Sequence, residues 1–149
     1  MLSLTKKTDY AILALSRLAT VDEGQVINVR EIATRFDLPA ELLAKAMQRL
    51  ARERLVISHA GPAGGYSLAR DPVDISVADI VLALEGPLRI AGCFDEDSSN
   101  PCAAIEKCTL REPIKRLQKR LFELLDGISL AEMSQDLVGV SDETSHLHG

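Results

Sequence analysis

The sequence predicts a mainly helical fold with one small β-hairpin, and three observations carry this prediction. Two short amphipathic segments, residues 29–36 and 40–54, are separated by only a tight turn. Two short strand-like runs around a Gly-rich turn follow them directly, at residues 55–68. A long segment with an apolar stripe closes the chain after residue 110. The expected architecture is a winged helix-turn-helix followed by a long C-terminal dimerisation helix.

The first helix is predicted over residues 4–18. Ala11, Leu15 and Leu18 recur on one broad apolar face, whose width indicates contact with two surfaces. Lys6 and Lys7 give it a basic start that is placed to reach a phosphate, although a pair of lysines at a helix end is more commonly just solvated.

The next two helices differ in what their outer faces carry. Ile32, Ala33 and Phe36 point inward from the first of them, which residues 37–39 bring to an end. The second helix has an apolar stripe and an opposite face of amide, charged and small side chains. These are Glu41, Ala44, Lys45, Gln48, Arg49 and Arg52. Such a face is often simply solvated, but its composition also suits the DNA major groove.

The hairpin supports the groove interpretation. Residues 55–57 and 66–68 are its expected strands, and Gly61 and Gly64 lie in the turn between them. Glycines keep the hairpin tip bare enough for its backbone to approach DNA closely, and His59 stands at the base of the tip. A helix-turn-helix followed at once by a hairpin is a winged helix.

Cys93, Cys102 and Cys108 are the only cysteines of the chain, and a polar loop separates the first two. Their odd number and the lack of an apolar signal segment favour reduced thiols in the cytoplasm over a disulfide. Structural zinc usually binds to short Cys-x(2–4)-Cys knuckles, whereas these cysteines are spaced x8 and x5. The spacing therefore favours an iron-sulfur cluster, then zinc, then no metal.

Composition limits the range of partners. The chain has 46% apolar residues, 3% aromatic residues and no Trp, which suits one modest core and argues against a stacking platform for single strands. The net charge of −5 is uneven. Residues 1–70 carry 10 Lys and Arg against 7 Asp and Glu, or +3, while residues 71–149 carry 7 against 15, or −8. Only the N-terminal half is a plausible partner for a phosphate backbone.

Two further helices are expected in the C-terminal half. Ser76 caps one that runs to Glu85 and ends at Gly86-Pro87. The other follows Cys108, with Thr109 and Glu112 in a capping-box pattern. Its apolar residues repeat at helical spacing and predict a second copy as the partner. They are Ile114, Leu117, Leu121, Leu124, Leu125 and Ile128.

Five stretches together resemble the family of winged-helix regulators typified by IscR and NsrR. They are LTKKTDYAILAL, RLARERLVISHAGPAGGYSLAR, ISVADIVLALEGP, the three cysteines and ISLAEM, and the resemblance runs over about residues 2–133. The resemblance implies a homodimeric transcription factor that binds a palindromic operator and holds an iron-sulfur cluster, 2Fe-2S or 4Fe-4S, on the cysteines and one further ligand. The ISVADIVLALEGP stretch looks most like members that regulate cluster assembly.

The chain departs from the family pattern at two positions. IscR-like members have a ligating histidine where this chain has Arg111, which stays charged and does not ligate. NsrR-like members use an aspartate of the other subunit, and Asp9 stands at that position. IscR-like members also carry an arginine in the wing where this chain has Ala60, so that insertion of the wing into the minor groove is in doubt.

The sequence thus predicts a cytoplasmic, non-enzymatic DNA-binding regulator that senses iron-sulfur, redox or nitric-oxide status. The expected divisions are a winged helix-turn-helix domain (1–85), a cysteine loop (86–110), a dimerisation helix with an end segment (111–134) and a polar tail (135–149). The expected DNA contacts are Lys6, Glu41, Lys45, Gln48, Arg49, His59, Gly61 and Gly64, and the expected cluster ligands are Cys93, Cys102, Cys108 and Asp9. The alternative is a zinc-stabilised or metal-free interaction module.

Overall fold

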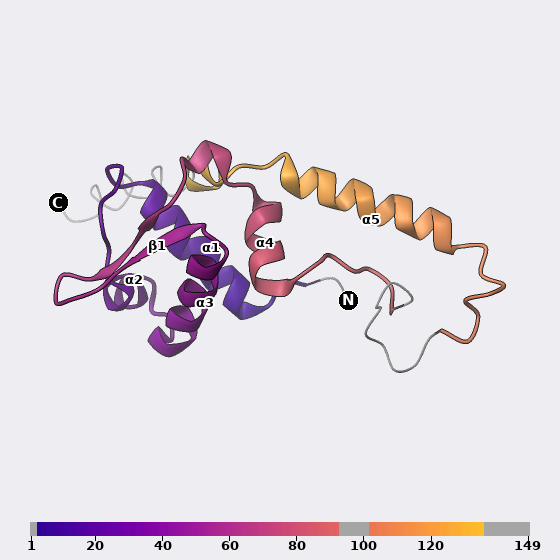
Figure 1. The fold of residues 1–149 in the computed structure, drawn as a ribbon, viewed down its shortest axis with the longest axis horizontal. Helices are drawn as coiled ribbons and strands as arrows, with labels where there is room; N and C mark the ends of the chain where they lie inside the picture. Colours follow the sequence, from indigo (N-terminus) through magenta and orange to yellow (C-terminus); the bar gives the residue numbers. More distant parts are fainter. Residues whose placement is uncertain (1–2, 93–101, 136–149) are drawn as a thin grey trace, which may run out of the picture.

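The computed structural model describes residues 3–92 and 102–135 of the chain. Three helices and a hairpin form a compact body, α4 lies along one side of it, and α5 extends away as an arm (Figure 1). The elements are α1 (Lys6–Ala19), α2 (Val29–Phe36), α3 (Ala40–Arg52), β1 (Val56–His59), β2 (Gly65–Leu68), the 3-10 turn η1 (Pro72–Asp74), α4 (Val77–Glu85) and α5 (Arg111–Asp126). Residues 130–135 are also helical. The predicted fold class is confirmed.

Both helices of the helix-turn-helix end in the same backbone motif. After α2, Asp37 adopts a left-handed conformation (φ 53°), and the Leu38 amide bonds the Ala33 carbonyl at 2.8 Å. After α3, Arg54 does the same (φ 61°), and the Leu55 amide bonds the Leu50 carbonyl at 3.0 Å. This is the Schellman motif, which normally uses glycine at the left-handed position. The predicted end of α2 at residue 36 is correct, because Pro39 marks it. No glycine or proline marks the end of α3, so the predicted end at residue 54 is two residues too late.

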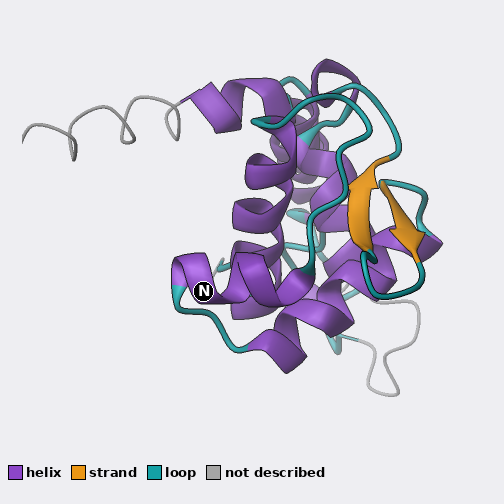
Figure 2. Ribbon diagram, turned by 90° about the vertical axis from the view of Figure 1, so that its left-hand side faces the viewer, coloured by secondary structure: helices purple, strands orange, loops and turns teal. Residues whose placement is uncertain are grey.

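The hairpin matches the predicted wing with a small shift. β1 and β2 pair antiparallel with Val56 opposite Leu68 and His59 opposite Gly65, and they flank the helices as Figure 2 shows. The predicted first strand began at Leu55, but Leu55 belongs to the turn that ends α3. A Cβ atom at Gly65 would lie 2.2 Å from the Ile27 carbonyl oxygen, because Ile27 pairs with Tyr66 in an isolated antiparallel bridge beside the hairpin. Glycine is therefore required there by close backbone approach.

The core collects residues from both ends of the chain. Leu15, Leu43 and Leu50 are fully buried, and so is Leu130 from the end segment. The Leu130 amide bonds the Ile75 carbonyl at 2.7 Å, and the Val77 amide bonds the Ile128 carbonyl at 2.9 Å. The end segment therefore packs into the winged-helix body, although the sequence grouped it with the dimerisation helix.

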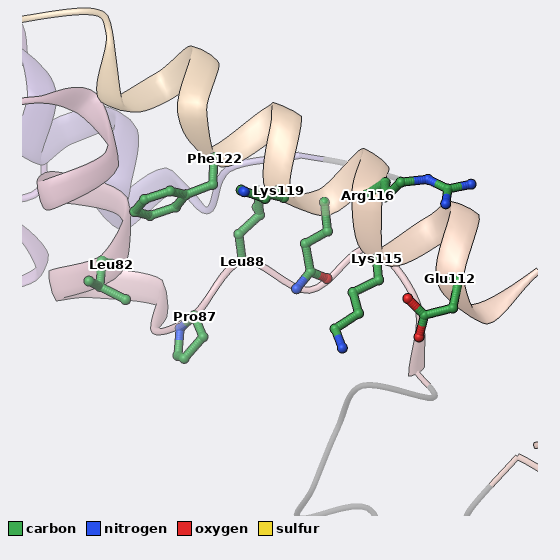
Figure 3. A pocket seen from close by; sticks show the side chains of 9 residues that line it. Leu82, Pro87, Leu88, Glu112, Lys115, Arg116, Lys119 and Phe122 are labelled. Carbon is green, nitrogen blue, oxygen red and sulfur yellow. The ribbon is translucent and has the colours of Figure 1, made fainter.

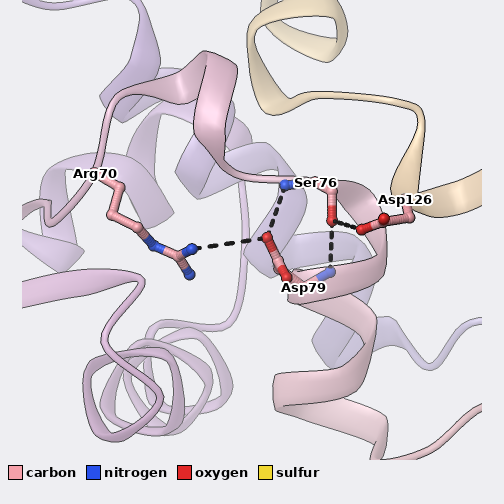
Figure 4. A network of polar contacts seen from close by, with 4 residues as sticks. All are labelled: Arg70, Ser76, Asp79 and Asp126. Atoms are coloured by element: carbon pink, nitrogen blue, oxygen red, sulfur yellow. Dashed lines mark hydrogen bonds and ion pairs between the residues drawn. The ribbon is translucent and has the colours of Figure 1, made fainter.

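The start of α4 carries the predicted cap. Ser76 Oγ accepts from the Asp79 amide and Asp79 accepts from the Ser76 amide, both at 3.0 Å, which forms a complete capping box. Ser76 Oγ also donates to Asp126 Oδ1 at the end of α5 (3.1 Å), and Arg70 lies 3.9 Å from Asp79 (Figure 4). One serine thus caps α4 and attaches the root of the arm.

The start of α5 does not match the sequence prediction. The helix begins at Arg111 after Leu110, which makes no side-chain capping bond, so the expected Thr109–Glu112 capping box is wrong. Residues 103–107 are turns, and the segment reaches Thr109 in a conformation that does not start the helix. No residue of α5 is buried. The arm therefore exposes the apolar stripe that the sequence predicted.

Candidate nucleic-acid interface and cysteine segment

Helix α3 presents a polar face to solvent from a firmly fixed position. Leu43, Ala46, Met47 and Leu50 are fully buried on its inner side. On the outer side Lys45 and Glu41 form an ion pair at 3.2 Å, with side chains 67% and 87% exposed, and Gln48 is exposed beside them. At this exposure the pair is worth little and leaves Lys45 available to a phosphate. The face has the chemistry of a groove-reading helix.

Arg49 is held differently from its neighbours. Its Nε donates to the Ala83 carbonyl of α4 at 3.0 Å, and its Nη2 lies 3.8 Å from Glu53 Oε1. The side chain is 50% exposed. The guanidinium is thus shared between α4 and the solvent face of α3.

The wing and the start of α1 contain the other expected DNA contacts. His59 Nε2 lies 2.8 Å from Ser67 Oγ, which ties its ring across the two strands. Gly61 adopts φ 96° in open space at the tip, whereas a side chain on Gly64 would come within 2.4 Å of the His59 carbonyl oxygen. Gly64 is therefore needed for the hairpin itself, and Gly61 for the bare tip. Lys6 is exposed at the first turn of α1.

The start of α1 is bound to the end of α4 through Glu85. Glu85 Oε1 accepts from the Thr5 amide at 3.0 Å and from the hydroxyls of Thr5 and Thr8. Partial burial raises the pKa of Glu85, but the hydrogen bonds from Thr5 and Thr8 and the charge of Lys7 outweigh it and lower the pKa below its ordinary value. The carboxylate is therefore stabilised in its charged form. Asp9 lies exposed one position after Thr8.

Two of the three cysteines lie within the described residues. Cys102 is exposed and Cys108 is half-buried, and both are free thiols, while Cys93 lies outside the described residues. Among residues 3–92 and 102–135, no group of three or more His, Cys, Asp or Glu is close enough to hold a metal ion. As donors, thiols on an accessible turn suit a soft metal or cluster. Asp9 belongs to the first turn of α1. The start of α1 lies beside the end of α4, whereas residues 102–108 lie beyond the far end of the arm (Figure 1).

The arm exposes an apolar seam with heptad spacing. Leu110, Leu117 and Leu124 follow one another every seven residues and are 61%, 51% and 62% exposed. Ile114, Leu121 and Ile128 alternate with them and are half-buried. This is the a/d pattern of a helix that packs on another helix.

On a different face of α5 from the seam, α4 and α5 enclose a groove of about 600 Å³. Leu82, Pro87, Leu88 and Phe122 form its apolar wall, and Lys115 and Lys119 project at its edge (Figure 3). Leu82 is 46% exposed and Phe122 is 38% exposed. The groove is therefore separate from the seam and lies between the arm and α4.

Sequence reasoning did not find the two contacts at the end of α4. The bond from Arg49 to Ala83 and the bonds from Thr5 and Thr8 to Glu85 join residues 34, 80 and 77 positions apart. One signal was available, because Pro87 removes the amide that would serve the Ala83 carbonyl. The donor that replaces it can be found only from the packing.

A helix-turn-helix with a flanking wing and an exposed polar helix face defines a DNA-binding protein of the winged-helix class. The family model described as Rrf2, iron-dependent transcriptional regulator, matches residues 4–136. The chain belongs to the Rrf2 family of transcriptional regulators, which are not enzymes.

Named relatives and solved structures agree with this assignment. The chain is 31% identical to the transcriptional repressor NsrR of Streptomyces coelicolor, with 95% of this chain and 98% of the relative covered. It is 29% identical to IscR of Citrobacter koseri, with 97% and 88% covered. The structure of CymR, the global cysteine regulator of B. subtilis, superposes with a TM-score of 0.71 at 25% identity over 91% of this chain and 98% of that one. The structure of T. potens IscR has a TM-score of 0.66 at 29% identity over 99% and 94%.

The described part of the chain has no helix that is long and apolar enough to cross a membrane.

Proposed function

We propose that this regulator is a homodimer that reads a palindromic operator and reports iron-sulfur, redox or nitric-oxide status through a cysteine-bound iron-sulfur cluster. The observation that carries the proposal is the set of three cysteines placed between a complete winged helix and a solvent-exposed heptad seam. A thiolate set of this kind has the softness that iron-sulfur clusters and zinc require. The cytoplasm, which holds DNA and keeps thiols reduced, is the proposed compartment.

The proposed DNA contacts follow from exposure. Lys45 and Gln48 on α3 face the major groove or its flanking phosphates, with Glu41 and the half-exposed Arg49 beside them. Lys6 reaches the backbone, and the tip at Gly61 and Gly64 approaches the flanking groove, with His59 at its base. Two copies related by a two-fold axis through α5 would present two such heads to half-sites about one helical turn apart.

The proposed ligands are Cys93, Cys102, Cys108 and, from the other subunit, Asp9. A bound cluster would supply an iron site whose oxygen ligand is more labile than a thiolate and is open to oxygen or nitric oxide. Asp9 belongs to the first turn of α1, and the start of α1 lies far from residues 102–108 of the same chain (Figure 1), which is consistent with a ligand contributed across the dimer. Arg111 begins α5 and is not a ligand.

The first experiment measures what the protein binds. Protein purified without oxygen should absorb visible light and contain iron and acid-labile sulfide in proportion, and Cys102→Ala should lose most of that absorbance while remaining a dimer. Full iron content in Cys102→Ala would contradict the cysteine assignment. A colourless protein with one zinc per chain, or with no metal, would favour the zinc-stabilised or metal-free alternative.

A second experiment addresses Asp9. Asp9→Ala should still take up iron through the cysteines, but with an altered visible spectrum and a weaker change in operator affinity on cluster loss. Asp9→Glu keeps a carboxylate and is the matched control. If Asp9→Ala matches the parent in spectrum, cluster lifetime and operator affinity, Asp9 is a surface acid and the fourth ligand lies elsewhere.

A further inference from the structure

In the last turn of α4, the carbonyl of buried Ala83 has no helical donor. The Ala83 carbonyl would normally accept from the amide four residues later, but that residue is Pro87, which has no N–H. The Gly86 amide is already used, because it bonds the Leu82 carbonyl at 3.1 Å. Ala83 is only 6% exposed, so that water has little access. A buried carbonyl in this position requires a donor from another element.

Arg49 supplies that donor from the middle of α3. Its Nε donates to the Ala83 carbonyl at 3.0 Å, and Glu53 lies 3.8 Å from Nη2, which steadies the guanidinium from the other side. A positive charge at the C-terminal end of a helix is also favoured by the helix dipole. The contact therefore joins α3 to α4 by a charge-assisted bond with fixed direction, in addition to apolar packing.

We propose that Arg49 is a positioning residue, which caps α4 and thereby sets the orientation of α3 on the body. The inference rests on the proposed role of α3 as the recognition helix. The planar guanidinium with its Nε donor fixes both the distance and the direction of the bond. Lysine, with a terminal charge on a flexible stem, does not reproduce this geometry. Arg49 therefore affects the affinity for DNA by fixing the orientation of α3.

The location of this cap links it to the rest of the molecule. Two residues after Ala83, Glu85 binds Thr5 and Thr8 at the start of α1. Residues 86–92 then lead from α4 to Cys93. The same turn of α4 therefore contacts the recognition helix and the first helix, and it begins the segment that carries the cysteines. A displacement of this turn would be transmitted to α3 through Arg49.

The test separates positioning from direct DNA contact. An operator is selected from a random duplex pool with the parent protein, and affinities for it, for its single-base variants and for an unrelated duplex are measured between about 50 and about 200 mM salt. Arg49→Met and Arg49→Lys should each lower the ratio of operator to unrelated affinity by about tenfold. The loss should extend over all base pairs that α3 reads, and the salt dependence should stay as in the parent.

Other outcomes would overturn the proposal. If Arg49→Met lowers the salt slope by about one and Arg49→Lys restores it, Arg49 is a phosphate contact. A loss confined to one base pair would make it a base reader. Hydrogen exchange at the Gly86 amide should quicken in both variants. Unchanged exchange would remove the cap, and this readout in Arg49→Lys decides the matter if Arg49→Met does not fold.

Lys45→Met is the matched control on the same helix. It should lower the salt slope by about one while the ratio of affinities is kept, because the Lys45 side chain is 67% exposed and pairs with Glu41 of its own helix. If Lys45→Met, Gln48→Ala and both Arg49 variants all bind as the parent does, the recognition-helix assignment fails. If only the two Arg49 variants bind DNA as the parent does, α3 is still the recognition helix and the positioning role of Arg49 is wrong.

Discussion

The winged-helix body and the α5 arm bury their apolar residues in opposite ways. In the body, Leu15, Ile32, Leu43 and Ile80 are fully buried against one another and against Leu130. Along α5 no residue is buried, and Leu117 and Leu124 are more than half exposed. The body therefore buries its apolar residues within one chain, whereas the apolar stripe of the arm can be buried only against another surface. The predictions below test this difference, from the largest expected effect to the smallest.

Loss of core volume should destabilise the body most. Leu15→Ala removes a fully buried side chain and leaves a cavity among α1, α3 and α4, so the free energy of unfolding should fall by about 2–5 kcal/mol. Urea denaturation followed by circular dichroism measures it. Val73→Ala, at a side chain that is 68% exposed, is the control and should change stability by less than about 0.5 kcal/mol. Equal effects at the two positions would show that the body has no specific core.

A charge in the seam should separate the copies without unfolding the body. Leu117→Glu places a carboxylate among the heptad leucines, so we expect monomers in sedimentation and a loss of operator affinity of about 100-fold or more, since one half-site then binds alone. Lys119→Gln changes the net charge by the same amount at an exposed position on the opposite side of α5 from the seam, and it should remain a dimer. A dimeric Leu117→Glu protein would place the subunit interface elsewhere.

The two capping-box patterns should behave differently. Ser76→Ala removes a cap that bonds the Asp79 amide and also the link to Asp126, so the unfolding free energy should fall by about 1 kcal/mol. Thr109→Ala removes a hydroxyl that does not cap α5, and its effect should be under about 0.5 kcal/mol. Thermal unfolding of both variants makes the comparison. A larger loss from Thr109→Ala would mean that α5 begins earlier in solution.

The smallest expected effect is a pH dependence at the α1–α4 junction. Because the folded pKa of Glu85 is lowered, its contribution to stability is present above the ordinary value of 4.5 and is lost as pH falls through the lowered pKa. The stability difference between parent and Glu85→Gln should therefore shrink as pH falls below 4.5. Urea midpoints between about pH 7 and about pH 3 measure it.

Thr8→Val is the control for that experiment. It removes one of the hydrogen bonds that lower the Glu85 pKa but leaves the carboxyl in place. Its acid-dependent loss should be smaller than that of the parent. A parent and a Glu85→Gln variant with parallel pH profiles would show that the junction does not titrate.

Local patterns in the sequence were sufficient for much of the body. The 3.6-residue period of apolar residues predicted α2 and α3, Ser76 marked the start of α4, and the glycines marked the wing. These signals depend on residues only a few positions apart, so they can be recognised in the sequence alone. The sequence also predicted the family, which the Rrf2 match over residues 4–136 confirms.

Only the tertiary structure decided how these parts meet. The burial of Leu130 in the body, the cap that Arg49 places on Ala83 and the bonds of Glu85 to the start of α1 all join residues far apart in sequence. Left-handed Asp37 and Arg54 show the same limit, since neither is the glycine that normally marks such a helix end in a sequence. The sequence by itself determined which segments form helices and strands, because their hydrogen bonds and the spacing of their apolar residues involve residues close together in the chain. Their mutual positions depend on packing and on buried polar groups that must find partners, which is a property of the folded chain as a whole.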